Sequence, residues 1–128
     1  MTENSLPPSW RGKRYYPLHS YLAERFPGSR VMKASIDAGF TCPNIDGTKG
    51  RGGCTYCLDG SGRSAPGSAR SIPDQIQTER ARIHAKWPHA GLIAYFQSNT
   101  NTYAPLPRLR ALFEETLAQP DVCGLAVA

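Results

Sequence analysis

The sequence predicts an α/β fold in which parallel β-strands alternate with helices. Three observations carry this prediction: apolar runs of strand length, amphipathic runs of helix length between them, and proline or glycine where one run gives way to the next. After a first short helix, the order is strand, long loop, helix, strand, loop, helix, strand. Alternation of this kind favours right-handed parallel units, which belong either to a barrel or to a doubly wound sheet.

The helices are predicted from apolar residues at helical spacing and from residues typical of helix ends. Ser71 suits the cap of the second helix, where Glu79 and Arg82 belong to the polar face. Proline marks the first turn or the end of every helix. The apolar positions are Leu18, Tyr21, Leu22 and Phe26 in the first helix, Ile72, Ile76, Ile83 and Trp87 in the second, and Leu109, Leu112, Phe113 and Leu117 in the third.

Three segments read as strands. Residues 31–37 alternate apolar and polar side chains, and residues 91–96 form a continuous apolar run typical of a buried strand. The last run, residues 121–128, is apolar and partly β-branched and stops without a turn or polar tail, so we expect a strand that is cut midway in a longer protein. Residues 1–15 are polar and proline-bearing, and we expect an N-terminal arm there.

Composition limits the binding partners and the cellular compartment that we expect for the protein. The chain carries 15 Lys and Arg against 10 Asp and Glu, a net charge of +5 that is typical of proteins that meet phosphates or nucleic acid. No apolar run is long enough to span a bilayer, and the N-terminus lacks the order of a signal peptide. We therefore expect a cytoplasmic protein with no membrane partner, in which the four cysteines are ligands or free thiols.

Three of these cysteines, Cys42, Cys54 and Cys57, lie in the long loop of residues 38–68. Soft thiolates in one functional loop indicate an iron-sulfur cluster or zinc. A structural zinc site needs a fourth ligand, for which Cys123 or His89 is the candidate, whereas three cysteines would leave one iron of a cluster open. In the cluster interpretation, Cys123 is instead a small core residue of the last strand.

The same loop carries a family resemblance. Residues 37–48 read DAGFTCPNIDGT, residues 52–57 read GGCTYC, and residues 94–105 read AYFQSNTNTYAP. These runs resemble the YhcC/YtqA-type radical S-adenosylmethionine proteins, from about residue 16 onward, and more distantly the catalytic subunit of Elongator. The resemblance implies that residues 16–128 are the incomplete N-terminal part of a radical S-adenosylmethionine core domain, a partial (β/α) barrel truncated at its third strand.

The resemblance also implies the chemistry. Cys42, Cys54 and Cys57 would hold a 4Fe-4S cluster whose open iron binds the amino and carboxylate groups of S-adenosylmethionine. An electron from an external donor would then release a 5'-deoxyadenosyl radical. Tyr56 would lie near the adenine. Ser98, Asn99 and Thr100, which stand where related enzymes carry a glycine-rich turn, would position the cofactor.

The substrate is less defined than the cofactors. The resemblance suggests modification of a wobble uridine in transfer RNA, and the basic composition agrees with this substrate. A different class of function stays open, a zinc-bearing RNA-binding module without radical chemistry. Stoichiometric zinc in a colourless protein would indicate the module, and iron in a brown protein would indicate the enzyme.

Overall fold

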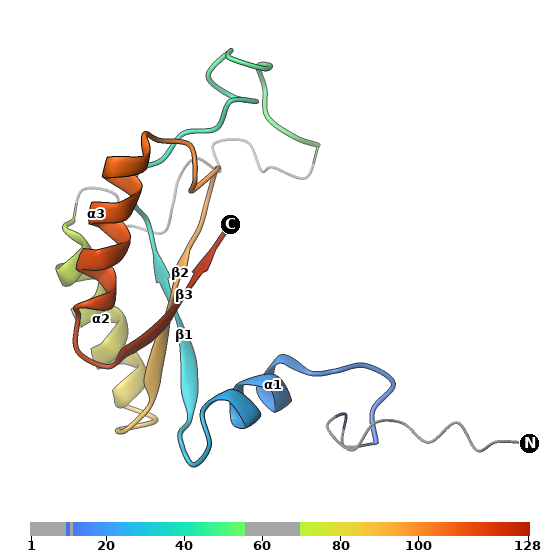
Figure 1. Ribbon diagram of the computed structural model, residues 1–128, viewed down its shortest axis with the longest axis vertical. Helices are drawn as coiled ribbons and strands as arrows, with labels where there is room; N and C mark the ends of the chain where they lie inside the picture. The colour runs from blue at the N-terminus through green and yellow to red at the C-terminus, as the bar shows by residue number, and fades with distance from the viewer. Residues whose placement is uncertain (1–9, 11, 56–69) are drawn as a thin grey trace, which may run out of the picture.

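The computed structural model describes residues 10, 12–55 and 70–128 and confirms the predicted order of elements (Figure 1). Its helices and strands are α1 (Leu18–Arg25), β1 (Val31–Ile36), α2 (Ile72–His84), β2 (Gly91–Phe96), α3 (Leu106–Leu117) and β3 (Val122–Val127). The caps follow the sequence prediction: the Ser71 side chain accepts a hydrogen bond from the Asp74 amide, and proline occupies the first turn of both α2 and α3.

The strands form one parallel sheet in the order β1-β2-β3. In Figure 1, α2 and α3 lie on the same side of this sheet, and α1 stands apart near the beginning of β1. The α/β class and the parallel pairing are therefore confirmed. The connections after β1 and β2 return the chain to start the next strand in the same direction, so the carboxyl ends of all three strands lie at the same end of the sheet.

The core lies between the sheet and the two helices. Alternate residues of β1 and β2 point toward α2 and α3 and are buried, because side chains of a strand alternate between its two faces, whereas Val122 and Leu125 of β3 are partly buried against the same core. Phe96, with 0% of its surface exposed, packs edge to face against Phe113 of α3 at a ring separation of 5.3 Å. The buried cluster consists of Ala34, Ile36, Ile72, Ile76, Ile83, Ala90, Leu92, Ala94 and Phe96.

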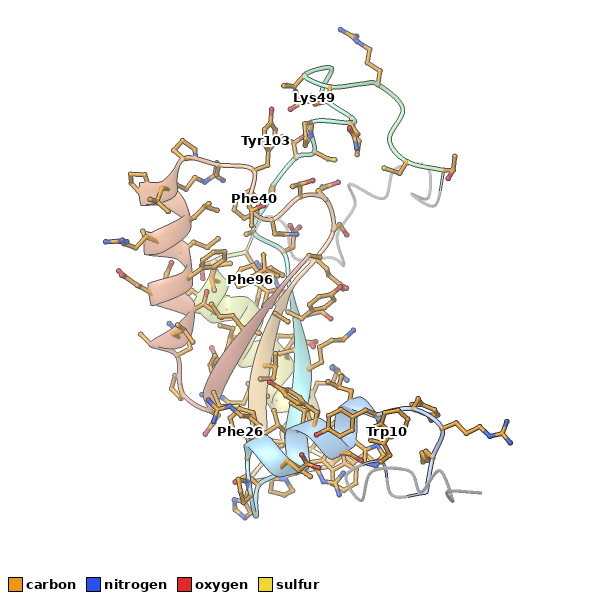
Figure 2. All side chains as sticks on the ribbon, turned by 45° about the vertical axis from the view of Figure 1, so that its right-hand side comes forward. Trp10, Phe26, Phe40, Lys49, Phe96 and Tyr103 are labelled. Carbon is orange, nitrogen blue, oxygen red and sulfur yellow. The ribbon has the colours of Figure 1, made fainter. Side chains whose placement is uncertain are left out.

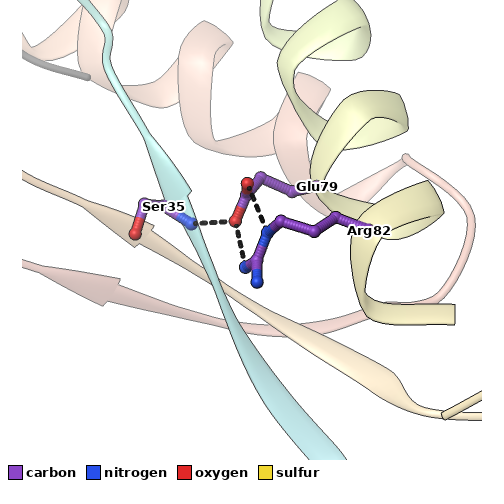
Figure 3. A network of polar contacts seen from close by, with 3 residues as sticks. All are labelled: Ser35, Glu79 and Arg82. Carbon is purple, nitrogen blue, oxygen red and sulfur yellow. Dashed lines mark hydrogen bonds and ion pairs between the residues drawn. The ribbon is translucent and has the colours of Figure 1, made fainter. Parts of the chain in front are cut away.

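Side chains of α2 cover the outer edge of β1, which has no neighbouring strand in the described residues. The Gln75 side-chain amide accepts a hydrogen bond from the Asp37 N–H and donates one to the Asp37 carbonyl, both at 2.8 Å. One turn further, Glu79 accepts a hydrogen bond from the Ser35 N–H at 3.2 Å and is held by Arg82 at 2.9 Å (Figure 3). These contacts satisfy backbone groups that an edge strand otherwise leaves exposed.

Glu79 should make the stability of the fold depend on pH. The hydrogen bonds from Arg82, and then that from Ser35, hold the pKa of Glu79 below its ordinary value of 4.5. A carboxyl group with a lowered pKa in the folded state stabilises the fold above its unfolded pKa, and this contribution is lost as the pH falls through the folded value. We therefore expect Glu79→Gln to lower the free energy of unfolding near neutral pH and much less at about pH 3.

Urea unfolding of both proteins at the two pH values measures this difference. Glu114→Gln is the matched control, because Glu114 is an exposed carboxylate without an ion pair among the described residues. A stability difference between wild type and Glu79→Gln that stays constant with pH would contradict the role assigned to the Glu79 carboxylate.

Helix α1 is present as predicted, but its apolar residues are not buried by the described part of the chain. Leu18 and Tyr21 are 68% and 47% exposed, whereas Ser20 is buried. Tyr16, just before the helix, donates a hydrogen bond to Glu24. No helix in the described ranges has the length and apolar composition needed to cross a membrane.

Candidate functional site

The candidate site lies beyond the carboxyl ends of β1 and β2, where the two following segments meet. The first contact continues the strand pairing, since the Gln97 N–H donates to the Ile36 carbonyl at 3.2 Å. Further along, the Asn99 side-chain amide donates to the Phe40 carbonyl at 2.8 Å, and Phe40 is shown at this end of the sheet in Figure 2. The turn after β2 therefore fixes the start of the cysteine loop.

Cys42 is held directly against this turn. The Thr100 hydroxyl donates a hydrogen bond to the Cys42 sulfur at 3.2 Å, and the Thr100 N–H donates to the carbonyl of Thr41 at 3.3 Å. The Cys42 carbonyl accepts hydrogen bonds from the amides of Ile45 and Asp46, which turns the chain back on itself. Cys42 is half-buried, and among the described side chains its sulfur accepts a hydrogen bond from Thr100.

Cys54 is placed by the far side of the same loop. The Asn44 side-chain amide donates to the Cys54 sulfur at 3.5 Å, and the Asn44 carbonyl accepts a hydrogen bond from the Gly53 N–H. Gly53 has a φ of +75°, a conformation that glycine adopts without steric cost, and it directly precedes the cysteine. Cys54 is also half-buried and carries no disulfide.

The tip of the loop is attached to the segment that leads into α3. Tyr103 donates a hydrogen bond to the Thr48 hydroxyl at 2.9 Å, and Figure 2 shows Tyr103 beside the loop that carries Lys49. The Arg108 guanidinium lies over the Phe40 ring, 5.3 Å from its centroid. Three successive parts of the chain thus surround the described portion of the cysteine loop: the end of β1, the turn after β2 and the beginning of α3.

The predicted site residues differ in how directly they take part. Asn99 and Thr100 contact the cysteine loop through their side chains, whereas the Ser98 carbonyl accepts a hydrogen bond from Asn101. Asn99 adopts a φ of +63°, which asparagine tolerates better than most residues. Tyr56 and Cys57 lie outside the described residues.

Two buried polar groups lie near the carboxyl ends of the strands, and the sequence assigned them no functional role. Asp37, directly after β1, is buried and accepts a hydrogen bond from the Gly39 N–H through Oδ1, while Oδ2 has no partner in the described residues. Asn101 is buried as well, and its Oδ1 likewise has no partner in that part of the chain. Asp37 follows β1 directly and Asn101 lies in the polar segment after β2, and a polar residue beyond the carboxyl end of a strand is the sequence signal that would have identified them.

The predicted core position of Cys123 is wrong. The pairing of β2 with β3 is irregular: Leu92 pairs with Val122 and Ile93 pairs with Gly124, so Cys123 is an extra residue between them. The irregularity leaves Cys123 exposed, with its thiol donating to the Leu92 carbonyl at 3.4 Å. A residue that a regular alternation would assign to the core therefore lies at the surface.

The structure also separates Cys123 and His89 from the cysteine loop. Both lie at the amino ends of strands, His89 just before β2 and Cys123 at the second residue of β3. Cys42 lies beyond the carboxyl ends, and a strand of this length spans about 16–20 Å. Neither residue is therefore placed to share one metal ion with Cys42.

The described sulfur atoms belong to a class of ligand that binds soft metals. Cys42 and Cys54 are free and half-buried, and each is in contact with a side-chain donor of the kind that orients metal-ligating side chains. Among the described residues, no three His, Cys, Asp or Glu side chains are grouped as a metal site, but the third cysteine of the loop lies outside those residues. The donor set matches soft metals rather than magnesium or calcium.

Several curated proteins are similar in sequence to this chain. The chain is similar to the uncharacterized protein YtqA of Bacillus subtilis. The two are 44% identical over 129 residues, which cover 100% of this chain and 40% of YtqA. YhcC of Escherichia coli is 36% identical over 106 residues, covering 83% of this chain and 33% of YhcC. MJ0486 of Methanocaldococcus jannaschii is 28% identical over 109 residues, covering 84% of this chain and 32% of MJ0486.

The chain therefore spans two fifths or less of the length of these curated relatives. No family model matches the sequence. No solved structure matches it either. The names of YtqA, YhcC and MJ0486 state no activity.

Proposed function

We propose that this chain is the N-terminal part of a radical S-adenosylmethionine enzyme in which Cys42, Cys54 and Cys57 hold a 4Fe-4S cluster. The observation that carries the proposal is the position of Cys42 and Cys54, in one loop beyond the carboxyl ends of parallel strands, each with a hydrogen-bond donor at its sulfur. Enzymes built on parallel β/α units place their active sites at the carboxyl ends of the strands. Three thiolates hold a cubane cluster and leave one iron for the cofactor.

The sheet supports the partial barrel that this function implies. Figure 1 shows α2 and α3 on one side of the sheet only, as the outer helices of a barrel are. Parallel sheets are covered on both faces in folded proteins, so the opposite face of β1, β2 and β3 is expected to line the inside of a partial barrel. Lys33 lies on that face, with its ammonium 4.7 Å from the centre of the Tyr95 ring.

The residues of the chain would have two roles, which are to bind the cluster and cofactor and to position the cysteine loop. When bound, the cluster and S-adenosylmethionine supply a 5'-deoxyadenosyl radical after one electron arrives from an external donor. Asn99 and Thr100 hold the cysteine loop against the end of β2. Ser98, Asn99, Thr100 and Tyr56 are proposed to contact the cofactor. A reducing cytoplasm suits this assignment, because thiolate ligands must stay reduced.

Transfer RNA is the substrate class that we propose, with a wobble uridine as the modified base. The surface around α1 supports it. Tyr15 and Tyr21 are 59% and 47% exposed, and the exposed basic side chains of Lys13, Arg14 and Arg25 lie in the same segment. Exposed aromatic rings stack on unpaired bases, and basic side chains contact phosphates. Glu24 is the one acidic residue between Lys13 and Arg25, and its carboxylate accepts a hydrogen bond from Tyr16.

Metal analysis of the protein purified without oxygen tests the proposal against the zinc-bearing RNA-binding module. We expect iron and sulfide, brown colour and, after reduction with S-adenosylmethionine present, formation of 5'-deoxyadenosine and methionine. Stoichiometric zinc without iron would replace the proposal by the module. The substrate is tested separately, by comparing modified nucleosides of transfer RNA from cells with and without the gene, where loss of one modified wobble uridine is the expected result.

A further inference from the structure

We infer that Thr100, and to a smaller extent Asn44, set the electron affinity of the cluster by donating hydrogen bonds to its cysteine ligands. The inference rests on the proposed function, since it takes Cys42 and Cys54 as cluster ligands. It assigns to these two residues a positioning and tuning role that is distinct from contact with the cofactor. The role begins with the observation that both described sulfurs of the loop accept one side-chain hydrogen bond.

The Thr100 hydroxyl is well fixed for this role. Its oxygen lies 3.2 Å from the Cys42 sulfur, and the backbone on both sides of the side chain is held, by the Thr100 N–H to the Thr41 carbonyl and by the Tyr103 N–H to the Thr100 carbonyl. A thiolate has no proton to give, so the hydroxyl must be the donor when Cys42 binds iron. The hydrogen bond therefore persists, and strengthens, as charge accumulates on the sulfur.

The direction of the effect follows from charge. Reduction adds one electron to the cluster, and part of the added negative charge resides on the cysteine sulfurs. A donor at a ligand sulfur stabilises the reduced state more than the oxidised state and raises the reduction potential. Removing the Thr100 hydroxyl should therefore make the cluster harder to reduce.

Asn44 is the weaker of the two donors. Its amide nitrogen lies 3.5 Å from the Cys54 sulfur, and Asn44 is exposed, so water competes with this hydrogen bond. Thr100 and its neighbour Cys42 are half-buried, and the lower local dielectric makes their contact the stronger one. The structure thus predicts an order: loss of the Thr100 hydroxyl lowers the potential more than loss of the Asn44 amide.

The reduction potential of the reconstituted cluster tests the inference. We expect Thr100→Val, which has the shape of threonine without its hydroxyl, to shift the midpoint potential to a more negative value, and Thr100→Ser to restore it toward wild type. Asn44→Leu should shift it in the same direction by less. The matched control is Thr102→Val, because Thr102 is an exposed residue of the same segment that donates no hydrogen bond to the sulfur of Cys42 or Cys54.

Iron and sulfide content distinguishes a failure of this inference from a failure of the proposed function. A full cluster in Thr100→Val with an unchanged potential would overturn the inference and leave the proposed function standing. A wild-type protein that takes up no iron would overturn both. If Thr100→Val cannot hold a cluster, the Asn44→Leu variant decides, since its substitution leaves the turn after β2 intact: a more negative potential supports the inference, and the wild-type value refutes it.

Discussion

Replacing Cys42 by alanine should remove the cluster almost completely. Anaerobic reconstitution is expected to load about four iron atoms per chain into the wild-type protein and close to none into the variant, because two thiolates do not retain a cubane. The substitution also removes the acceptor of the Thr100 hydroxyl, so the loop loses one of its attachments to β2. Iron and sulfide analysis, with the visible absorption of the cluster, measures the result. Cys54→Ala and Cys57→Ala should behave in the same way.

Cys123→Ala is the matched control for this experiment. It removes a thiol from an exposed position at the other end of the sheet, where the sulfur contacts only the Leu92 carbonyl among the described hydrogen-bonding groups. We expect this variant to bind as much iron as the wild type. Loss of iron in Cys123→Ala, together with full loading of Cys42→Ala, would show that the ligand assignment is wrong.

The second large effect concerns Phe96, the last residue of β2. Its side chain is fully buried and packs against Phe113 of α3, so alanine at this position leaves a large cavity. The expected loss in the free energy of unfolding is about 3–5 kcal/mol, which is a large share of the total stability of a typical domain. Chemical denaturation followed by circular dichroism measures it.

The attachment of the cysteine loop should weaken as well, because Phe96 precedes the turn that holds this loop. Leu106→Ala is a suitable control: Leu106 lies on α3 but is 69% exposed, and the expected change is within about 0.5 kcal/mol. If Phe96→Ala proves too unstable to purify, Phe96→Leu creates a smaller cavity and should give an intermediate loss. Equal stability of Phe96→Ala and wild type would contradict the position of Phe96 in the core.

The elements of the fold were predictable because each has a clear period and clear ends. The alternation of residues 31–36, the continuous apolar run of residues 91–96 and the proline-started helices all appear at the expected places. Cys123 was not predictable, because an irregularity in strand pairing depends on the neighbouring strand. The exposure of Leu18 and Tyr21 could not be predicted either, since a periodic apolar stripe does not identify its partner.

The sequence proposes residues for the candidate site but not their contacts. The sequence identifies the cysteines and the polar turn after β2, yet it does not show that Thr100 meets Cys42, which are 58 residues apart. That contact depends on the parallel register of β1 and β2, which brings the ends of both strands to one level. Glu79 is a similar case: helical spacing places it on a polar face, and only the packing of α2 on β1 brings it to the Ser35 N–H.

The α2 side chains on the outer edge of β1 disfavour the addition of another strand at its carboxyl end. Gln75 occupies the edge with the same donor and acceptor pair that a neighbouring strand would offer, so a peptide segment can pair there only by displacing it. Each hydrogen bond so displaced contributes about 0.5–1.5 kcal/mol, and the core contacts of α2 add to this barrier. Pairing of another strand with this part of β1, and self-association through it, are therefore disfavoured.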